Sequence, residues 1–245
     1  MDTLFNDISR SVSTHQRCSK KLCGMMKNDE AMVGQFLLAI DQILLYSSSN
    51  AYLDRLMKFI VRVMSNSDLE EGNFEEILKH VCGRSGCVDK TVRLRCCKIL
   101  ANSFSASDIK NCPIELSEEM CDLVVTSFLP RLRDRFQGVR SEAVGVLGRF
   151  QQEEEDEITK ELIRMLEQET SKDMRKLCVE NVMLTPRTIT PIVNRLRDVS
   201  WEVRLSVLST LFSKVHVTAL SPSHLMQVTK IISFLTTYWG DFIEN

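Results

Sequence analysis

The segment Arg131-Leu132-Arg133-Asp134 is followed, after four further residues, by Val139-Arg140, and the same pattern returns at Arg195-Leu196-Arg197-Asp198 with Val203-Arg204. Six positions agree at identical spacing between these two copies. Looser copies stand at Asp89–Arg93 and Asp173–Arg175. A motif that recurs within one chain indicates a repeated structural unit. The chain is therefore expected to be an array of related units.

A stripe of apolar residues at helical spacing begins one residue before each repeated arginine. The four sets are Val92, Cys96, Ile99 and Leu100; Val139, Ala143, Val146 and Leu147; Met174, Cys178 and Val182; and Val203, Val207 and Leu211. Residues three, four and seven apart lie on one face of a helix. The copies recur at an irregular period of about 40 residues, which is the range of HEAT and armadillo repeats.

The same helical spacing runs through most of the chain. Helices are predicted at 15–27, 30–46, 51–64, 74–82, 90–104, 117–129, 137–150, 157–167, 172–183, 188–196, 201–214 and 223–238. No segment alternates polar and apolar residues as a strand does, and only 9 glycines and 5 prolines are present. We predict an all-α fold, an α-solenoid of HEAT/armadillo-type repeats, in a single domain over 1–245 with an atypical terminal segment at 236–245.

Each repeated aspartate is expected to cap or precede the second helix of its unit, where a carboxylate can accept hydrogen bonds from free backbone N–H groups. The arginine just inside that helix can pair with an aspartate of the next unit and so link neighbouring repeats. We refer to this series of contacts as the Arg–Asp ladder. Its predicted members are Asp89, Arg93, Asp134, Arg140, Arg175, Asp198 and Arg204.

Charge gives a weaker indication. The chain has 31 basic and 33 acidic residues, so any nucleic-acid binding must depend on a local basic patch. Stacked repeats would place several cations on one face; ordinary solvated charge is the alternative. No aromatic residues alternate with them, so sequence-independent contact with phosphates is expected. The candidate DNA-binding residues are Arg131, Arg133, Arg135, Lys172, Lys176, Arg195 and Arg197.

Four of these arginines, Arg131, Arg133, Arg195 and Arg197, directly precede a repeated aspartate. They are expected at the turn or at the end of the first helix. At that place we expect them to face a ligand more freely than the ladder arginines do.

No motif for catalysis, for a cofactor or for a metal is found. His80, Cys82 and Cys87 come nearest to a zinc pattern, but their spacing is wide and a fourth ligand is not evident. The nine cysteines contain no C-x-x-C pair and are expected to be small buried apolar residues. No signal peptide and no membrane-spanning segment are predicted. We expect no enzyme activity, cofactor, small-molecule substrate or membrane partner.

Two longer stretches are more particular than the repeat. Leu129–Val144 contains the first R-L-R-D copy, and Thr185–Val199 reads T-P-R-T-I-T-P-I-V-N-R-L-R-D-V. Both resemble the HEAT-repeat subunit of condensin called CAP-G, or condensin complex subunit 3. Asp89–Cys97 resembles the preceding repeat of that family, and the resemblance spans roughly residues 15–232. It implies the N-terminal portion, or a truncated form, of such a subunit.

The resemblance also implies a function. Members of this family bind the kleisin subunit of condensin and, together with it, hold double-stranded DNA in a basic groove. The SMC ATPase pair of the complex supplies ATP hydrolysis, and the complex compacts mitotic chromosomes. Localisation to the nucleus and the chromosome follows, with a cytoplasmic pool. In this chain the loop after the helix at 30–46 is Ser47-Ser48-Ser49-Asn50, where the family carries basic residues.

One alternative keeps the fold and changes the partner. A HEAT-repeat adaptor of the phosphatase-scaffold or transport-receptor type would bind acidic or apolar peptides and no DNA. An enzyme, the third class, would need a cleft with perturbed titratable groups, for which the sequence gives no sign. Duplex binding that falls steeply with salt separates the first two.

Overall fold

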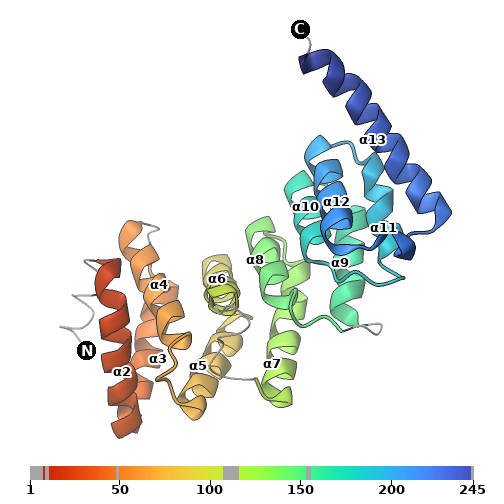
Figure 1. Cartoon of the computed structure of the whole chain (residues 1–245). Helices are drawn as coiled ribbons and strands as arrows, with labels where there is room; N and C mark the ends of the chain where they lie inside the picture. Colours follow the sequence, from red (N-terminus) through yellow and green to blue (C-terminus); the bar gives the residue numbers. More distant parts are fainter. Residues whose placement is uncertain (1–7, 9–10, 48–49, 107–115, 153–155, 244–245) are drawn as a thin grey trace. The chain divides into compact units, whose positions relative to one another are not determined.

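The structure is a computed structural model that describes residues 8, 11–47, 50–106, 116–152 and 156–243, with side chains left out at 106 and from 234 onward. Every regular element in these ranges is an α-helix or a short 3-10 helix (Figure 1). The predicted all-α solenoid fold is confirmed. The segment 236–245, predicted to be atypical, lies outside the described side chains.

The chain divides into two compact units, which are described one at a time. Unit 1 is Met1–Val146 and unit 2 is Leu147–Asn245. Unit 1 contains η1 (Val12–Thr14), α2 (His15–Asn28), α3 (Glu30–Leu45), α4 (Ala51–Met64), α5 (Glu71–Arg84), α6 (Lys90–Ala106), α7 (Glu118–Phe128), η2 (Leu129–Arg133) and α8 (Gln137–Leu147, whose last residue falls in unit 2). Unit 2 contains α9 (Glu157–Gln168), α10 (Lys172–Asn181), α11 (Ile189–Asn194), η3 (Arg195–Arg197), α12 (Trp201–Lys214), η4 (Val217–Ala219) and α13 (Pro222–Ile243).

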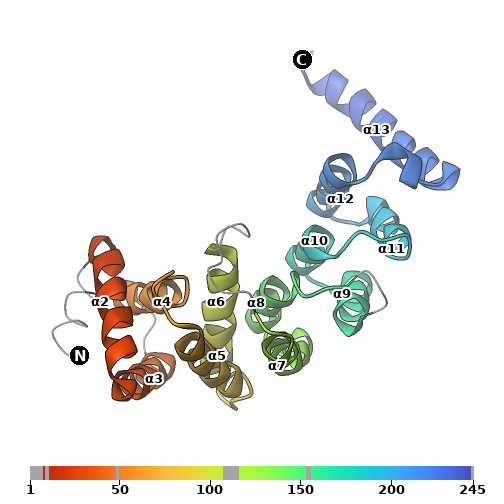
Figure 2. The same ribbon diagram turned by 60° about the horizontal axis from the view of Figure 1, so that its bottom comes forward.

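In unit 1 the helices form two rows (Figure 2). The first helices of successive pairs, α3, α5 and α7, pack side by side, and the second helices α4 and α6 do the same. Helix α8 continues the second row, since its Gly138 and Gly145 lie against Leu94 and Ala101 of α6. Helix α2 packs on both α3 and α4.

Unit 2 repeats this plan. The first helices α9 and α11 pack against each other, and the second helices α10 and α12 form the other row. Helix α13 packs against α11 and η3, so it extends the row of first helices.

Side-chain caps mark where several helices begin. The side chains of Asp29, Asn50, Ser117 and Asp156 each accept a hydrogen bond from a backbone N–H in the first turn of α3, α4, α7 and α9. These N–H groups have no partner inside the helix, so a capping oxygen stabilises the start by about 1 kcal/mol.

The predicted helical stripes form the core. The four predicted apolar sets begin at Val92, Val139, Met174 and Val203. All their members are buried, with at most 4% of their surface exposed. Each helix pair buries its apolar face only against its neighbours, as expected of a solenoid.

Two predicted helices end in a 3-10 turn that the apolar periodicity does not predict. The helix predicted at 117–129 ends at Phe128 and continues as the 3-10 helix η2, which has Pro130 in its first turn. The helix predicted at 188–196 splits into α11 and η3. In both places the R-L-R segment forms a tight 3-10 turn, and the aspartate after it adopts an extended conformation.

Candidate functional site

The four repeated arginines make one contact in common. In each case Nη1 donates to the carbonyl oxygens of the residues six and five positions earlier, in the turn before the helix. For Arg93 these are Cys87 and Val88, at 2.9 and 2.6 Å; for Arg175 they are Glu169 and Thr170, at 3.0 and 2.8 Å. Arg140 bonds to Asp134 and Arg135 at 2.9 and 3.4 Å, and Arg204 to Asp198 and Val199 at 2.6 and 3.3 Å. Each arginine therefore fixes the turn of its own repeat.

Two of the arginines also reach the next repeat. In unit 1 Arg93 holds Asp134 through two hydrogen bonds, from Nε at 2.6 Å and from Nη2 at 3.1 Å. In unit 2 Arg175 holds Asp198 in the same way, at 2.7 Å for both bonds. The four side chains are at most 8% exposed. These are rungs of the predicted ladder, and both are bidentate and buried.

The carboxylates stay ionised despite their burial. Burial opposes the charge of Asp134 and Asp198, but the hydrogen bonds from Arg93 and Arg175 outweigh it and hold the pKa of both carboxyls below the ordinary value. Each carboxylate also accepts a backbone N–H two residues on, from Phe136 at 3.0 Å and from Ser200 at 2.9 Å. The aspartates thus precede α8 and α12 and shape the turn that enters them.

Asp89 caps its helix as predicted, but it stands at a different place in the motif from Asp134 and Asp198. It lies four residues before Arg93, whereas Asp134 and Asp198 lie six residues before Arg140 and Arg204. Its carboxylate accepts the N–H of Thr91 at 2.6 Å and caps α6. In this repeat the ladder position is occupied by Cys87. The contacts of Arg140 and Arg204 described above lie within their own turns.

Arg131 and Arg195 are more exposed than Arg93 and Arg175, but each also lies against an aspartate. Arg131 lies 3.7 Å from Asp134, and Arg195 lies 3.4 Å from Asp198 and donates to the carbonyl of Glu167 at 3.0 Å. Their side chains are 19% and 23% exposed. The 3-10 turn folds each arginine back onto the aspartate three residues later, so both take part in the ladder.

The other candidate cations lie on the surface. Arg133, Arg135 and Arg197 are exposed, at the turns of the R-L-R-D segments. On α10, Lys172 forms an ion pair with Glu202 at 2.6 Å, and Lys176 lies 3.8 Å from Glu180. Hydrogen bonding to Glu202 raises the pKa of Lys172. The two lysines are thus partly neutralised by neighbours on α10 and α12.

Two polar contacts that link repeats have no counterpart in the sequence prediction. Arg95 of α6 is buried and donates through Nη1 to the carbonyls of Ile43, Leu44 and Tyr46, which end α3. Within the row of first helices, Asp41 of α3 accepts hydrogen bonds from His80 and Arg84 of α5, the shortest at 2.7 Å. Neither contact lies inside the repeated motif, which is why the motif does not indicate them.

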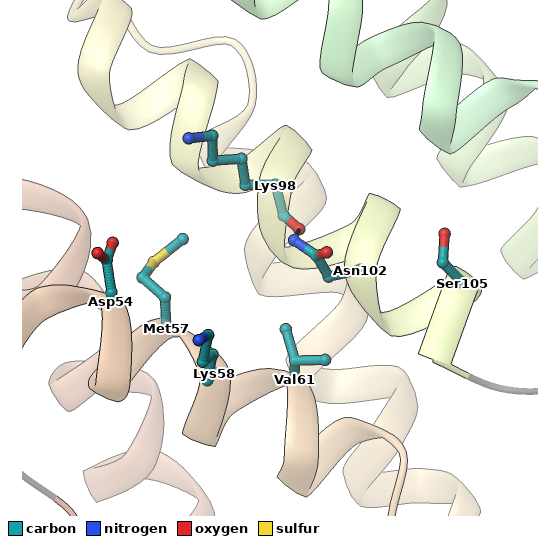
Figure 3. A pocket seen from close by; sticks show the side chains of 7 residues that line it. All are labelled: Asp54, Met57, Lys58, Val61, Lys98, Asn102 and Ser105. Atoms are coloured by element: carbon teal, nitrogen blue, oxygen red, sulfur yellow. Dashed lines mark hydrogen bonds between the residues drawn. The ribbon is translucent and has the colours of Figure 1, made fainter. Parts of the chain in front are cut away.

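A groove runs between α4 and α6 (Figure 3). It encloses about 510 Å³ and is bordered on the α4 side by Asp54, Met57, Lys58 and Val61, and on the α6 side by Lys98, Asn102 and Ser105. Met57 and Val61 are half-buried, while the polar members are exposed. An apolar strip with charges of both signs along it suits a peptide segment.

Six of the described cysteines are buried, while Cys87 and Cys121 are partly exposed. Eight of the nine lie in the described part of the chain, and burial raises the pKa of Cys23 to about 11 and of Cys82, Cys97 and Cys178 to about 12. Burial therefore keeps these thiols protonated. Within the described residues, no group of three or more His, Cys, Asp or Glu side chains could hold a metal ion.

None of the helices over the described ranges is long and apolar enough to cross a membrane.

Stacked helix pairs, joined by buried Arg–Asp contacts, define a protein of the HEAT-type α-solenoid class. Comparison with known proteins narrows this class. The chain is similar to condensin complex subunit 3 of Schizosaccharomyces pombe, with 29% identity over 84% of this chain and 23% of that protein. It is 24% identical to condensin complex subunit 3 of Homo sapiens over 76% of this chain and 19% of that one. No family model matches.

The fold agrees with these relatives. A chain in the crystal structure of the S. pombe condensin Cnd3–Cnd2 subcomplex superposes with a TM-score of 0.74 at 25% identity, covering 94% of this chain and 30% of that chain. The chain is thus similar to condensin complex subunit 3 in sequence and in fold, and the resemblance seen in the sequence is confirmed. It spans less than a third of the length of the relatives it matches.

Proposed function

We propose that this chain is a non-catalytic HEAT-repeat scaffold of condensin that binds the kleisin subunit and double-stranded DNA. The observation that supports this most is the similarity of 94% of the chain to a chain of the Cnd3–Cnd2 subcomplex. In this proposal the SMC ATPase pair supplies the ATP hydrolysis. The chain then acts at mitotic chromosomes in the nucleus, where it contributes to their condensation.

The groove between α4 and α6 is the place we propose for a kleisin segment. An extended peptide can bury apolar side chains against Met57 and Val61 while its charged groups meet Lys58, Lys98 and Asp54 at the rims. Such contacts resemble the anchors of other peptide interfaces, where a few buried apolar groups supply most of the affinity.

Co-purification with the kleisin tests this part. Met57→Glu with Val61→Glu puts two charges on the apolar strip and is expected to abolish co-purification. Leu38→Glu with Leu45→Glu is the matched control, since both leucines are exposed on α3, outside the groove. Equal loss in the two variants, or retention in both, argues against the groove as the kleisin site.

For DNA we propose the exposed arginines Arg133, Arg135 and Arg197. They project at the turns of the repeats, and a guanidinium suits a phosphate because it offers two parallel hydrogen bonds. Arg131 and Arg195 contribute indirectly, because they hold the turns that carry these three. Lys172 and Lys176 are assigned a smaller part, since Glu202 and Glu180 already neutralise them in part.

Fluorescence anisotropy with a labelled duplex tests the DNA part. The triple variant Arg133→Glu, Arg135→Glu and Arg197→Glu is expected to lower affinity at least about tenfold, since each lost phosphate contact removes a released counterion. The control is Lys20→Glu, Lys21→Glu and Lys230→Glu, which changes the net charge by the same amount at exposed positions elsewhere.

A loss of affinity in the triple variant that the control reproduces in full contradicts the assignment to the three arginines. Kleisin association with no duplex binding by the unaltered complex would keep the scaffold role and contradict the DNA part, whereas association with neither would favour the HEAT adaptor.

A further inference from the structure

Helix α3 presents to solvent a side without charged residues. Apart from Glu30, which begins the helix, every exposed residue of α3 is uncharged. The spacing of these residues along the chain places them on one side of the helix, which we call the α3 outer face. Two large apolar side chains stand out on it, since Leu38 and Leu45 are 64% and 70% exposed. The α3 outer face consists of Ala31, Gly34, Gln35, Leu38, Gln42 and Leu45.

The exposed sides of other first helices are charged. They carry Glu71, Glu76, Lys79 and Arg84 on α5; Glu118, Glu119 and Asp122 on α7; and Glu157, Lys160 and Glu167 on α9. A helix side in contact with water normally carries such charges. Helices α2, α4, α5 and α6 all pack on α3, yet the described residues leave its outer face open. Exposed leucines on an uncharged surface indicate a contact with another molecule.

Small and large residues are unevenly divided along the α3 outer face. Ala31 and Gly34 lie in its first half, Leu38 at its centre, and Gln42 and Leu45 in its second half. A Cβ built on Gly34 would meet nothing within 4 Å, so a large side chain of another molecule can approach there. Ala31, Leu38 and Leu45 recur every seventh residue, which is the spacing of a seam between two packed helices.

This division makes the α3 outer face complementary to itself. When two copies meet with their α3 helices antiparallel and a two-fold axis at Leu38, Ala31 of each copy lies opposite Leu45 of the other. Gly34 then lies opposite Gln42. A two-fold dimer uses the same patch on both subunits in this way. In a parallel pair the small residues would face each other across a gap, which loses packing contacts.

Charges on the neighbouring helix favour the same arrangement. Asp41 of α3 bonds to Arg84 of α5, so α5 runs beside the α3 outer face. The exposed ions of α5 are acidic in its first half, at Glu71 and Glu76, and basic in its second half, at Lys79 and Arg84. In an antiparallel pair the acidic half of each α5 lies on the side of the basic half of the other. A parallel pair would bring like charges together.

We propose that the α3 outer face binds the same face of a second copy of this chain, as an antiparallel pair of helices. The proposal does not depend on the proposed binding of kleisin or DNA. Helix α3 has 16 residues and is about 24 Å long. A pair of such helices buries on the order of 1,000 Å² in total, which is the lower limit for a specific interface. We therefore expect a dimer that dissociates at micromolar concentrations.

Sedimentation velocity of the full chain over a micromolar concentration series tests this proposal. We expect the 28.1 kDa monomer to convert to a dimer as the concentration rises. Leu38→Glu with Leu45→Glu places like charges opposite each other and is expected to weaken the dimer at least about tenfold. Val88→Glu with Val217→Glu is the control, because it makes the same charge change at two other exposed apolar residues. It should leave the dimer unchanged.

A glycine substitution separates specific packing from general apolar association. Gly34→Leu adds an exposed apolar group where the second copy needs a small residue, and we expect it to weaken the dimer at least about tenfold. It should not lower the melting temperature, because the site is open and leucine favours a helix more than glycine does. Gly24→Leu on α2 is the matched control, since a Cβ there also meets nothing within 4 Å.

Cysteine cross-linking tests the antiparallel arrangement. Leu38→Cys lies at the two-fold axis, so with diamide as oxidant it is expected to form a disulfide-linked dimer that the unaltered chain does not form. Ala31→Cys should not, because the two copies of residue 31 lie about 21 Å apart along the pair, too far for a disulfide. Cross-linking of Ala31→Cys as efficient as that of Leu38→Cys contradicts the arrangement.

Three results in sedimentation overturn the proposal. One is a monomer at every concentration. Another is a dimer that persists when Leu38 and Leu45 are replaced by glutamate, since the association then uses another surface. The third is a dimer that Gly34→Leu strengthens, which would be general apolar association. Kleisin co-purification is read separately, and the groove between α4 and α6 is tested by its own variant, so failure of one proposal leaves the other standing.

Discussion

The carboxylate of Asp198 is 1% exposed and accepts hydrogen bonds from Arg175, from Arg195 and from the N–H of Ser200. In unit 1, Asp134 accepts hydrogen bonds from Arg93 and from the N–H of Phe136, and Arg131 lies 3.7 Å from its carboxylate. A buried ion pair of this kind contributes little net stability compared with apolar packing, but it is costly to break. Its role is therefore to fix the register between neighbouring repeats.

Removal of one partner should show this cost. Arg175→Met leaves Asp198 buried, with only the long contact to Arg195 at 3.4 Å among the ion pairs described above. It is expected to lower the free energy of unfolding by ~3–5 kcal/mol. Arg84→Met breaks a more exposed pair with Asp41 and should cost about 1 kcal/mol or less. Urea denaturation followed by circular dichroism compares the two. Similar losses would mean that the Arg175 pair is no more than a surface contact.

The same carboxylates predict a dependence on pH. Their folded pKa values lie below the unfolded value of about 3.9, so the stability they supply is complete above that value and is lost as pH falls through the folded pKa. We expect the melting temperature to decrease when the pH is lowered below about 4. A variant with Asp134→Asn and Asp198→Asn should be less stable at pH 7 and should lose less on acidification. A parallel fall in both proteins would exclude these two aspartates as the source.

The sequence predicts the ladder correctly in part, and the failures have one cause. Spacing indicates which residues recur, and so it predicts the aspartates at 134 and 198 and the arginines at 93 and 175. Spacing does not predict the local backbone conformation. Because R-L-R forms a 3-10 turn, Arg131 and Arg195 fold back onto the aspartates, a contact that the spacing alone does not predict.

Helices were easier to predict than the contacts between them. The boundaries of α4 and α12 match the predicted 51–64 and 201–214, because apolar periodicity and polar breakers coincide there. Arg95 shows what periodicity misses. Its position in the helical pattern is that of an ordinary solvated residue. In the structure it donates hydrogen bonds to three carbonyls at the end of α3, which lie 49 to 52 residues earlier in the chain.

Loss of the Arg95 contact should weaken one helix junction. Arg95→Met keeps the aliphatic stem and removes the donors, which leaves buried carbonyls of α3 unpaired. We expect a loss of ~1–3 kcal/mol in the free energy of unfolding, with faster amide exchange near the end of α3. Lys98→Met is the control, since it removes a cation from the same helix at an exposed position. Unchanged exchange in α3 would contradict the capping role.

The packing of α8 has a sharper test. Val139, the residue just before Arg140 in the motif, is 1% exposed on the buried face of α8. Val139→Asp places an unpaired carboxylate among apolar groups, which costs several kcal/mol and is a large part of the stability of a domain. We predict loss of the cooperative thermal transition. Gln137→Asp, at an exposed position of the same helix, should melt as the unaltered chain does.

For the chain as a whole, the fold could be predicted from its repeats, and the family from the two longer stretches that resemble condensin complex subunit 3. What physical reasoning from the sequence could not give is the surface. The groove between α4 and α6 and the exposed apolar side chains of α12 depend on how the helices stack, which no single motif encodes. The proposed partners of the chain are macromolecules.

Duplex-DNA binding by the purified complex of this chain with the kleisin segment, measured by anisotropy over a series of salt concentrations, tests the proposed function most directly. We predict sequence-independent binding whose affinity falls linearly with salt on logarithmic axes, with a slope reduced by about 2–3 in the Arg133, Arg135 and Arg197 variant. No binding at low salt, or a slope that the three substitutions leave unchanged, would contradict the account.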